Sequence, residues 1–395
     1  MSIVAKAHGM DGTLVEPDWP PLALDEVHTL LRQYQGCDGP IEILSVSPRP
    51  FSAASVVKVG GRRIFVKRHH RDVRDQEGLL EEHRFLEYLW TQGADVPRVL
   101  AASSGETAIE SGEWTYEVHE SPAGIDLYEE AISWTPFRSA GHAHAAGRAL
   151  ARLHQAARGF AEPPRKPRPL AASFTIFAAK DAGATMNRYL AARPALGNYL
   201  QGRRNCDEAL ELLAPFHAEL LPLIQALAPL WTHNDLHASN LFWSDATDKA
   251  QATAVIDFGL ADRTNAVHDL AHAIERNIVE WLTLVNDPAH PDAVAVHFDH
   301  LQALLEGYEQ VRRLSAEEAA ALAPMTALCH AEFALSETDY FLSVLHSEEK
   351  APMAAEGWLV GHARWFHSEA GRQLMDALCR WADERKPFAT GVVRS

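Results

Sequence analysis

The sequence predicts an α+β fold, with a small antiparallel sheet near the N-terminus and helices in most of the remaining chain. Three short apolar runs are typical of strands: 41–46, 54–59 and 62–67. Gly60-Gly61 between the last two is a two-residue hairpin signal. Helical periodicity extends over four stretches: 75–92, 139–158, 207–227 and 295–381.

The composition indicates one compact, soluble protein. Of its 395 residues, 47% are hydrophobic, which is ample for a core. The sequence contains no run of 18 or more apolar residues, so we expect no membrane span. The formal charge of -17 disfavours nucleic acid and anionic membranes as partners, because both require a basic face. The same charge suits a cationic small molecule.

Cysteine use and the N-terminus favour a cytoplasmic location. The four cysteines are far apart and form no C-x-x-C pair, so we expect neither a disulfide framework nor a cysteine metal cluster. The first 20 residues lack the apolar core of a signal peptide. We expect residues 1–22 to form a loose arm.

Two motifs contain the polar residues that we interpret as catalytic. WTHNDLHASNLFW (231–243) places Asp235 and Asn240 in a polar loop between apolar flanks, and AVIDFG (254–259) places Asp257 after a short buried strand. Phosphoryl transfer requires positioning and charge neutralisation, so we assign Asp235 as the catalytic base that takes the proton of an attacking hydroxyl. Asn240 and Asp257 supply the oxygen ligands that suit Mg²⁺.

H-x-D-x-x-x-x-N followed by I-D-F-G resembles the aminoglycoside phosphotransferase and choline kinase-like superfamily, small-molecule relatives of the protein kinases. The resemblance follows the motif order over roughly residues 25 to 280. It implies a bilobal protein-kinase-like fold, with a nucleotide-binding sheet lobe (23–120) and a larger, mostly helical lobe (121–395) that holds the catalytic loop and the acceptor.

The resemblance assigns the nucleotide-binding residues. Lys67, at the end of the third strand, corresponds to the phosphate-binding lysine, and Glu82 on the helix at 75–92 is its expected acidic partner, with Glu81 and Glu77 as alternatives. The loop 47–56 contains no glycine, so Ser52 and Ser55 are expected to supply donors to the phosphates.

The strand at 113–120 leads into the expected hinge between the lobes. The backbone of Glu120 and Ser121 is placed at the purine edge, and the nucleotide is ATP or GTP. Gly124 allows the sharp turn into the helical lobe.

Other polar residues receive structural roles. His154 is interpreted as a core or helix-end residue and His233 as an internal brace of the catalytic loop. His233 and His237 have no third ligand nearby, so a zinc site is rejected there. Asp269 is interpreted as the N-cap of the next helix. The stretch EFALSETDYF offers acidic and aromatic candidates for holding a cationic acceptor: Glu332, Glu337, Asp339 and Tyr340.

These inferences combine into an ATP-dependent phosphotransferase that acts on a hydroxyl of a small molecule, with an amine-bearing sugar, an amino alcohol or a homoserine-like compound as acceptor. A protein serine/threonine kinase is the first alternative, although the chain between Gly259 and Asp269 is short for an activation segment. A nucleotide-binding pseudokinase is the second, and the complete set of Lys, Glu, Asp, Asn and Asp argues against it.

Overall fold

The computed structural model describes residues 7–9 and 12–385 and contains a five-stranded antiparallel sheet in the order β3-β4-β5-β7-β6. Its strands are β3 (Ile41–Val46), β4 (Ala53–Val59), β5 (Arg62–His70), β6 (Ala108–Ser111) and β7 (Trp114–Glu120). Gly60 and Gly61 both have positive φ, 55° and 82°, as a tight two-residue hairpin requires. The expected strands and hairpin are therefore present, and the α+β class is confirmed.

The two faces of the sheet have different environments. Val57, Ile64 and Val66 are fully buried on one face, in a core that includes Leu31 of α1 (Leu24–Leu31). Successive side chains of a strand point to opposite faces, so Lys67 of β5 faces away from this core. Helix α2 (Gln76–Thr91) begins after the N-cap Asp75 and matches the helix expected at 75–92.

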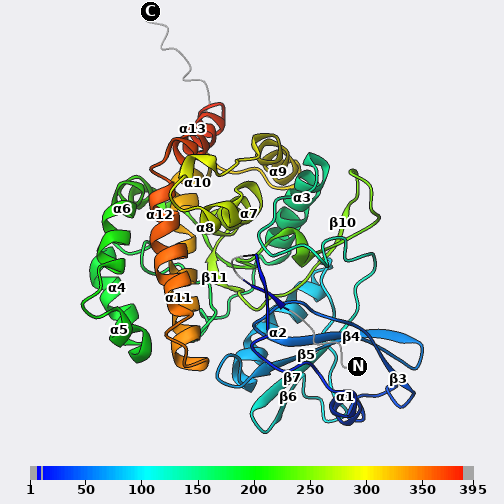
Figure 1. Ribbon diagram of the computed structural model, residues 1–395. Coiled ribbons are helices and arrows are strands. Elements are labelled where there is room, and N and C mark those ends of the chain that lie inside the picture. The colour runs from blue at the N-terminus through cyan, green and yellow to red at the C-terminus, as the bar shows by residue number, and fades with distance from the viewer. Residues whose placement is uncertain (1–6, 10–11, 386–395) are drawn as a thin grey trace, which may run out of the picture.

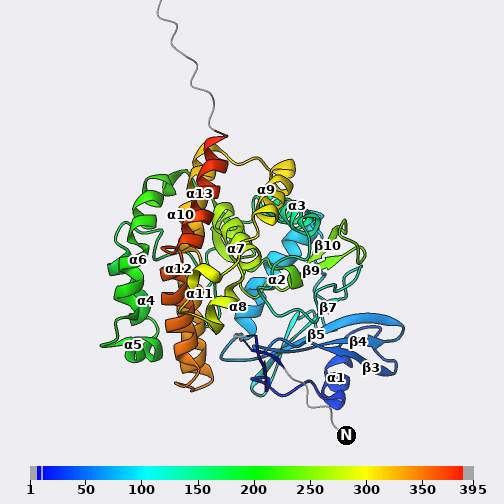
Figure 2. The same ribbon diagram turned by 45° about the horizontal axis from the view of Figure 1, so that its top comes forward.

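Helices make up most of the chain after Glu120 and lie on one side of the sheet (Figure 1). They are α3 (Ala140–Ala156), α4 (Ala182–Ala191), α5 (Pro194–Leu200), α6 (Asn205–Leu220), α7 (Ala266–Ile278), α8 (Trp281–Asn286), α9 (Phe298–Val311), α10 (Ala316–Leu328), α11 (His330–Asp339), α12 (His362–Trp365) and α13 (Glu369–Asp383), with π-helices at Tyr340–Val344 and Met353–Gly361. Every residue of α7 is buried, and Figure 2 shows this helix enclosed by its neighbours. Helix α7 is therefore the central element of the helical lobe.

Two short strand pairs hold the motif loops side by side. Strand β8 (Pro229–Thr232) pairs with β11 (Asp262–Asn265), and β9 (Leu241–Trp243) pairs with β10 (Ala252–Val255). The loop 233–240 connects β8 to β9, and the loop 256–261 connects β10 to β11. Both loops therefore run between the same two strand pairs, which brings the two sequence motifs together.

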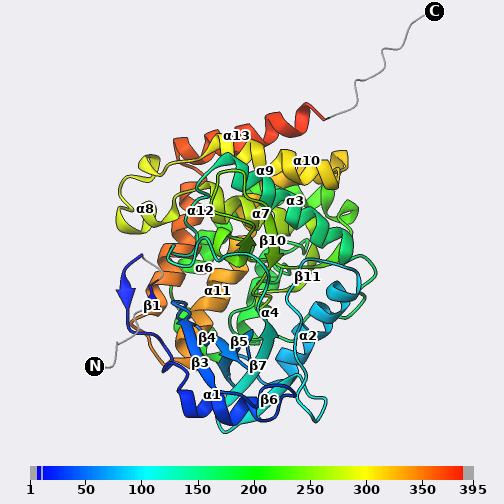
Figure 3. The same cartoon turned by 90° about the vertical axis from the view of Figure 1, so that its right-hand side faces the viewer.

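The N-terminal arm is not loose in its described part. Trp19 stacks on His70 of β5 with ring centroids 4.7 Å apart, and its indole donates to the carbonyl of Phe51 at 3.1 Å. Asp18 accepts hydrogen bonds from Lys350 and Tyr340 of the helical lobe at 2.5 and 3.0 Å. Figure 3 shows β1 (Ala7–His8) at the boundary between sheet and helices, where it pairs with β2 (Leu14–Val15). The remainder of the expected arm, residues 1–6 and 10–11, lies outside the described residues.

Within residues 7–9 and 12–385, no helix is both long and apolar enough to cross a membrane.

Candidate active site

Asp235 lies in the loop between β8 and β9, with its side chain 17% exposed. Its Oδ1 is 3.1 Å from Nε of the fully buried Arg276, and its Oδ2 accepts a hydrogen bond from Nδ2 of Asn240 at 3.3 Å. Loss of solvent raises the pKa of Asp235 to about 6, against the opposing charge of Arg276. The carboxylate is thus ionised at neutral pH and can accept a proton.

The backbone before Asp235 is held by Asp269, which is not an N-cap. Helix α7 begins at Ala266, and Asn265 caps it by accepting from the amide of His268. Asp269 is fully buried, and its two carboxylate oxygens accept from the amides of His233 and Asn234 at 2.8 and 2.7 Å. The expected capping role is therefore wrong, because the carboxylate points out of the helix and fixes the catalytic loop.

Two histidines support this loop as structural groups. His154 of α3 bonds to Asp269 at 2.9 Å and is 1% exposed, which agrees with its interpretation as a core residue. His233 contacts the carbonyl oxygen of Ile256 at 2.9 Å through Nε2, and its Nδ1 accepts from the amide of Asp235 at 3.2 Å. His233 therefore joins the two motif loops from inside, as expected.

Asp257 lies opposite the sheet and forms an ion pair with Lys67, with 2.9 Å between Oδ1 and Nζ. Desolvation in the cleft opposes both charges, yet the carboxylates of Asp257, Glu117 and Glu82 raise the pKa of Lys67, and Lys67 lowers the pKa of Asp257. Asp257 also has a φ of 59°, a left-handed conformation that Asp tolerates better than most residues. Lys67 and Asp257 are therefore both charged at neutral pH.

Glu82 is not the ion-pair partner of Lys67 in this structure. Its Oε2 lies 3.4 Å from the guanidinium of Arg165, and Glu81 is also close to Arg165, at 3.6 Å. The expected Lys67–Glu82 pair is corrected to Lys67–Asp257, because the buried Arg165 sits beside Glu82. Glu82 still lines the cleft that holds Lys67.

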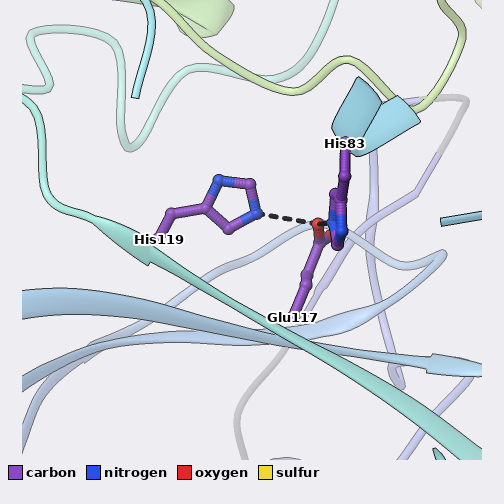
Figure 4. Close-up of side chains that lie close together, drawn as sticks. All are labelled: His83, Glu117 and His119. Atoms are coloured by element: carbon purple, nitrogen blue, oxygen red, sulfur yellow. Dashed lines mark hydrogen bonds and ion pairs between the residues drawn. The ribbon is translucent and has the colours of Figure 1, made fainter. Parts of the chain in front are cut away.

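A second carboxylate, Glu117 of β7, is directly opposite Lys67 in the sheet register. Its oxygens contact His69, His83 and His119 at 2.9, 3.0 and 2.7 Å (Figure 4 shows the last two). Burial opposes the charge of Glu117, but these three histidines lower its pKa well below the usual range. Glu117 therefore contributes a fixed negative charge behind Lys67.

Two clefts meet at these residues. The first, of about 950 Å³ including its open mouth, contains Asp235, and the second, of about 990 Å³, reaches the end of β7. Arg49, Lys67, Asn240 and Asp257 line both clefts. The junction thus combines cations, carboxylates and an amide where two bound molecules would face each other.

The second cleft combines apolar walls with backbone groups at the end of β7. Phe65, Phe242 and Ile256 supply apolar walls, and Glu120 and Ser121 lie at its end. The amide of Glu120 already donates to the carbonyl of Arg98 at 2.9 Å, whereas the amide of Ser121 makes only a long 3.4 Å bond. Of these two amides, that of Ser121 is the one more available to a ligand.

The loop between β3 and β4 differs from the sequence expectation. Ser52 lines the first cleft, but Ser55 is on the face of β4 that carries Val57, and its buried hydroxyl has no hydrogen-bond partner. Ser55 therefore does not face the clefts, because it lies an even number of residues from a core position. Arg49, from the same loop, occupies the junction instead.

The first cleft has aromatic walls from Phe51, Trp134 and Phe333. Trp134 and Leu170 also line it and have φ values of 66° and 52°, which are uncommon for bulky residues and concentrate at functional sites. Strained backbone is therefore retained along the wall of this cleft.

The acidic and aromatic candidates at 332–340 lie outside both clefts. Glu332 accepts from the amide of Ile176 and the hydroxyl of Ser173, and Asp339 is 4.0 Å from Arg193. Tyr340 donates to Asp18. Glu337 is fully buried without a hydrogen-bond partner, and burial raises its pKa to about 8. None of the four lines either cleft.

Sequence reasoning missed Arg49, Glu117 and Arg276. Arg49 stands in the very loop chosen for phosphate contacts, so its charge was the available signal. Glu117 stands opposite Lys67 only once the register of β5 and β7 is known. Arg276 lies 41 positions after Asp235, and nothing local marks it.

Comparison with known proteins identifies the family to which the chain belongs. Residues 49–314, more than half of the chain, match the sequence model of the phosphotransferase enzyme family. This match confirms the resemblance drawn from the motifs. None of the curated proteins compared with the chain matches it.

Solved structures share the fold at low sequence identity. An aminoglycoside phosphotransferase from Alicyclobacillus acidocaldarius is 17% identical, with a TM-score of 0.52, 93% of this chain covered and 98% of the other. A microcompartment-associated aminopropanol kinase is 19% identical, with a TM-score of 0.53 and coverages of 88% and 99%. An amicoumacin kinase in complex with AMP-PNP and Ca²⁺ is 14% identical, with a TM-score of 0.52 and coverages of 91% and 93%. The kinase-like fold is therefore confirmed.

Proposed function

Because the chain belongs to the phosphotransferase enzyme family, we propose that it transfers the γ-phosphoryl group of ATP to a hydroxyl of a small molecule. One observation carries the proposal: Lys67, Asn240 and Asp257 line both clefts, and Asp235 lines the first alone. A nucleotide in the second cleft would thus present its terminal phosphate toward an acceptor beside Asp235.

The chain's own residues divide the work. Asp235 takes the proton of the acceptor hydroxyl, and Arg276 keeps it ionised. Lys67 and Arg49 bind phosphate oxygens, and Ser52 lies beside them. The carboxylates of Glu82 and Glu117 raise the pKa of Lys67 and so keep it protonated. Charge neutralisation at the junction lowers the barrier without any covalent intermediate.

Asn240 and Asp257 fit a hard divalent cation such as Mg²⁺. Asn240 donates its Nδ2 to the carbonyl of Asp235 at 2.9 Å, which leaves its Oδ1 as the acceptor for a cation. Asp257 adds a carboxylate with a lowered pKa. When bound, the ion supplies positive charge to the phosphates of the nucleotide.

We place ATP in the second cleft, with Glu120 and Ser121 at the purine. GTP remains the alternative, since backbone groups carry the contact. For the acceptor we propose an amine-bearing sugar, an amino alcohol or a homoserine-like compound. The first cleft combines the carboxylate of Asp235 with aromatic walls, which suits a compact molecule that carries an amine. The free cysteines suit the cytoplasm.

A protein substrate is less well accommodated. Only residues 260–265 separate Gly259 from α7, and Asp262–Asn265 of this stretch are paired with β8 as β11. Little chain is left to hold an extended peptide, whereas the first cleft has the size of a small-molecule site.

The test is ADP release from ATP and Mg²⁺ with a panel of amino alcohols, aminoglycosides, homoserine and a generic protein. We expect turnover with a small hydroxyl compound that Asp235→Asn and Asp257→Ala both abolish. Thermal shift with ATP separates the alternatives. Nucleotide binding without turnover of any acceptor would favour a pseudokinase, and phosphorylation of the protein alone would favour a protein kinase. Absence of nucleotide binding would refute the proposal.

A further inference from the structure

A second group of polar side chains lies inside the helical lobe, away from both clefts. Glu275 of α7, His330 at the start of α11 and His362 at the start of α12 are 1%, 3% and 3% exposed. Their ligand atoms all lie within 4.8 Å of one another. Three helices that are distant in sequence thus converge on one point.

These side chains have no hydrogen-bond partners. Both carboxylate oxygens of Glu275 and both ring nitrogens of His330 and of His362 are buried and unpaired. Leaving a buried carboxylate without a partner is strongly destabilising. Native proteins rarely retain such a set unless another group satisfies it.

Aromatic side chains surround the three residues. Trp281 stacks on His362 with ring centroids 3.7 Å apart. Trp134 and Trp358 contact His330 edge-on at 5.8 and 6.3 Å. Arg276, the next residue along α7, has its Nε 3.1 Å from Oδ1 of Asp235, and its guanidinium lies over the rings of Trp134 and Phe333. The three side chains therefore face one another in an aromatic enclosure.

The spacing differs from that of a hydrogen-bonded cluster in the same molecule. In the sheet lobe, Glu117 lies 3.0 and 2.7 Å from His83 and His119, so protons occupy those contacts (Figure 4). In the helical lobe, Oε1 of Glu275 lies 3.5 Å from Nδ1 of His330 and 3.5 Å from Nδ1 of His362. Ligands about 2.0–2.1 Å from a tetrahedral zinc ion are separated by roughly 3.4 Å.

We propose that Glu275, His330 and His362 bind a structural Zn²⁺ ion that clamps α7 to α11 and α12. Two imidazoles and one carboxylate form a set that zinc accepts, with a water molecule completing the tetrahedron. None of the three residues lines either cleft, so the ion does not reach the substrates. Its effect would be to fix α7, which carries both Arg276 and Asp269 against the catalytic loop.

The test uses the full chain without an affinity tag, because histidine tags bind zinc. The protein is stripped with a chelator, loaded with excess Zn²⁺, desalted and assayed for metal by mass spectrometry. We expect one zinc per chain in the wild type and an affinity more than about 100-fold weaker in Glu275→Gln, since ligand loss exceeds the 10- to 100-fold effect of outer-shell changes. His297→Ala removes a member of the partly exposed triplet of His297, Asp299 and His300, and serves as the matched control that retains zinc.

A second measurement keeps the test valid if Glu275→Gln fails to fold. The melting temperature of the stripped wild-type chain should rise on addition of Zn²⁺, because an ion that binds only the folded state stabilises it. Wild-type protein that retains no zinc after desalting and shows no change in melting temperature would overturn the proposal. Equal zinc retention by Glu275→Gln and the wild type would overturn it too, and zinc lost from His297→Ala alone would move the ion to the surface triplet.

Discussion

Replacing Arg276 by Met should move the pH dependence of catalysis upward. Arg276 is the cation nearest to the base, 3.1 Å from Oδ1 of Asp235, and it opposes the burial that raises the pKa of Asp235 to about 6. A cation in contact with an aspartate lowers its pKa by about 1–3 units. Without Arg276, the pKa should therefore rise to between about 7 and 9.

The expected loss of rate follows from the ionised fraction. At pH 7, a base with a pKa of about 6 is about nine-tenths ionised, whereas one with a pKa of about 8 is about one-tenth ionised. The value of kcat/KM for the acceptor at pH 7 should thus fall about tenfold in Arg276→Met. Because the base itself is intact, the rate should recover above pH 9.

The assay is the profile of kcat/KM from pH 5 to 10 for the wild type, Arg276→Met and Arg276→Lys, with saturating ATP and Mg²⁺. Protonation of ATP affects all three enzymes equally, so the difference between their profiles reports the ionisation of groups on the protein. Arg276→Lys keeps the charge and should shift the acid limb less. An acid limb of Arg276→Met that coincides with that of the wild type would refute the role given to this ion pair, as would a loss of rate that is the same at every pH.

Three further outcomes are expected. Lys67→Met should lower kcat/KM for ATP by about 10²–10³, as loss of one preorganised donor does, and a loss under about tenfold would contradict its phosphate contact. Asp269→Ala should lower the free energy of unfolding in urea by about 3–5 kcal/mol, because two buried amides lose a charged acceptor. Asn265→Ala removes only the helix cap and should lower it by about 1 kcal/mol. Equal losses in the two variants would argue against the role of Asp269 in bracing the catalytic loop. Glu337→Gln should stabilise the protein increasingly as the pH rises. The pKa of Glu337 is raised to about 8 from an ordinary 4.5, so the folded state holds the proton that the unfolded state loses, and wild-type stability falls by about 1.4 kcal/mol per pH unit between these values. Parallel unfolding curves for both proteins at pH 5.5 and 7.5 would contradict this.

Local signals predicted the elements that local residues determine. The hairpin at Gly60-Gly61 and the helix after Asp75 follow from turn chemistry and apolar spacing, and both are present. The loop with Asp235 and Asn240 was recognisable because it combines a motif with apolar flanks.

Pairings between distant residues could not be predicted in the same way. An aspartate in the first turn of a helix fits capping by its position alone, yet Asp269 accepts from amides 35 and 36 positions earlier. The Lys67–Glu82 pair was expected without knowledge of Arg165, which reaches Glu82 from 83 positions away. Both errors arose where a long-range contact competed with a plausible local one.

The contacts of the N-terminal arm have a consequence for the order of folding. Asp18 is synthesised well before its partners Tyr340 and Lys350, which follow 322 and 332 positions later. Contacts of such sequence separation form late, because a long loop must close before they stabilise anything. His8 and Gly9, on the same arm, line the cleft that holds Asp235. That wall of the cleft can be completed only after synthesis has passed Lys350.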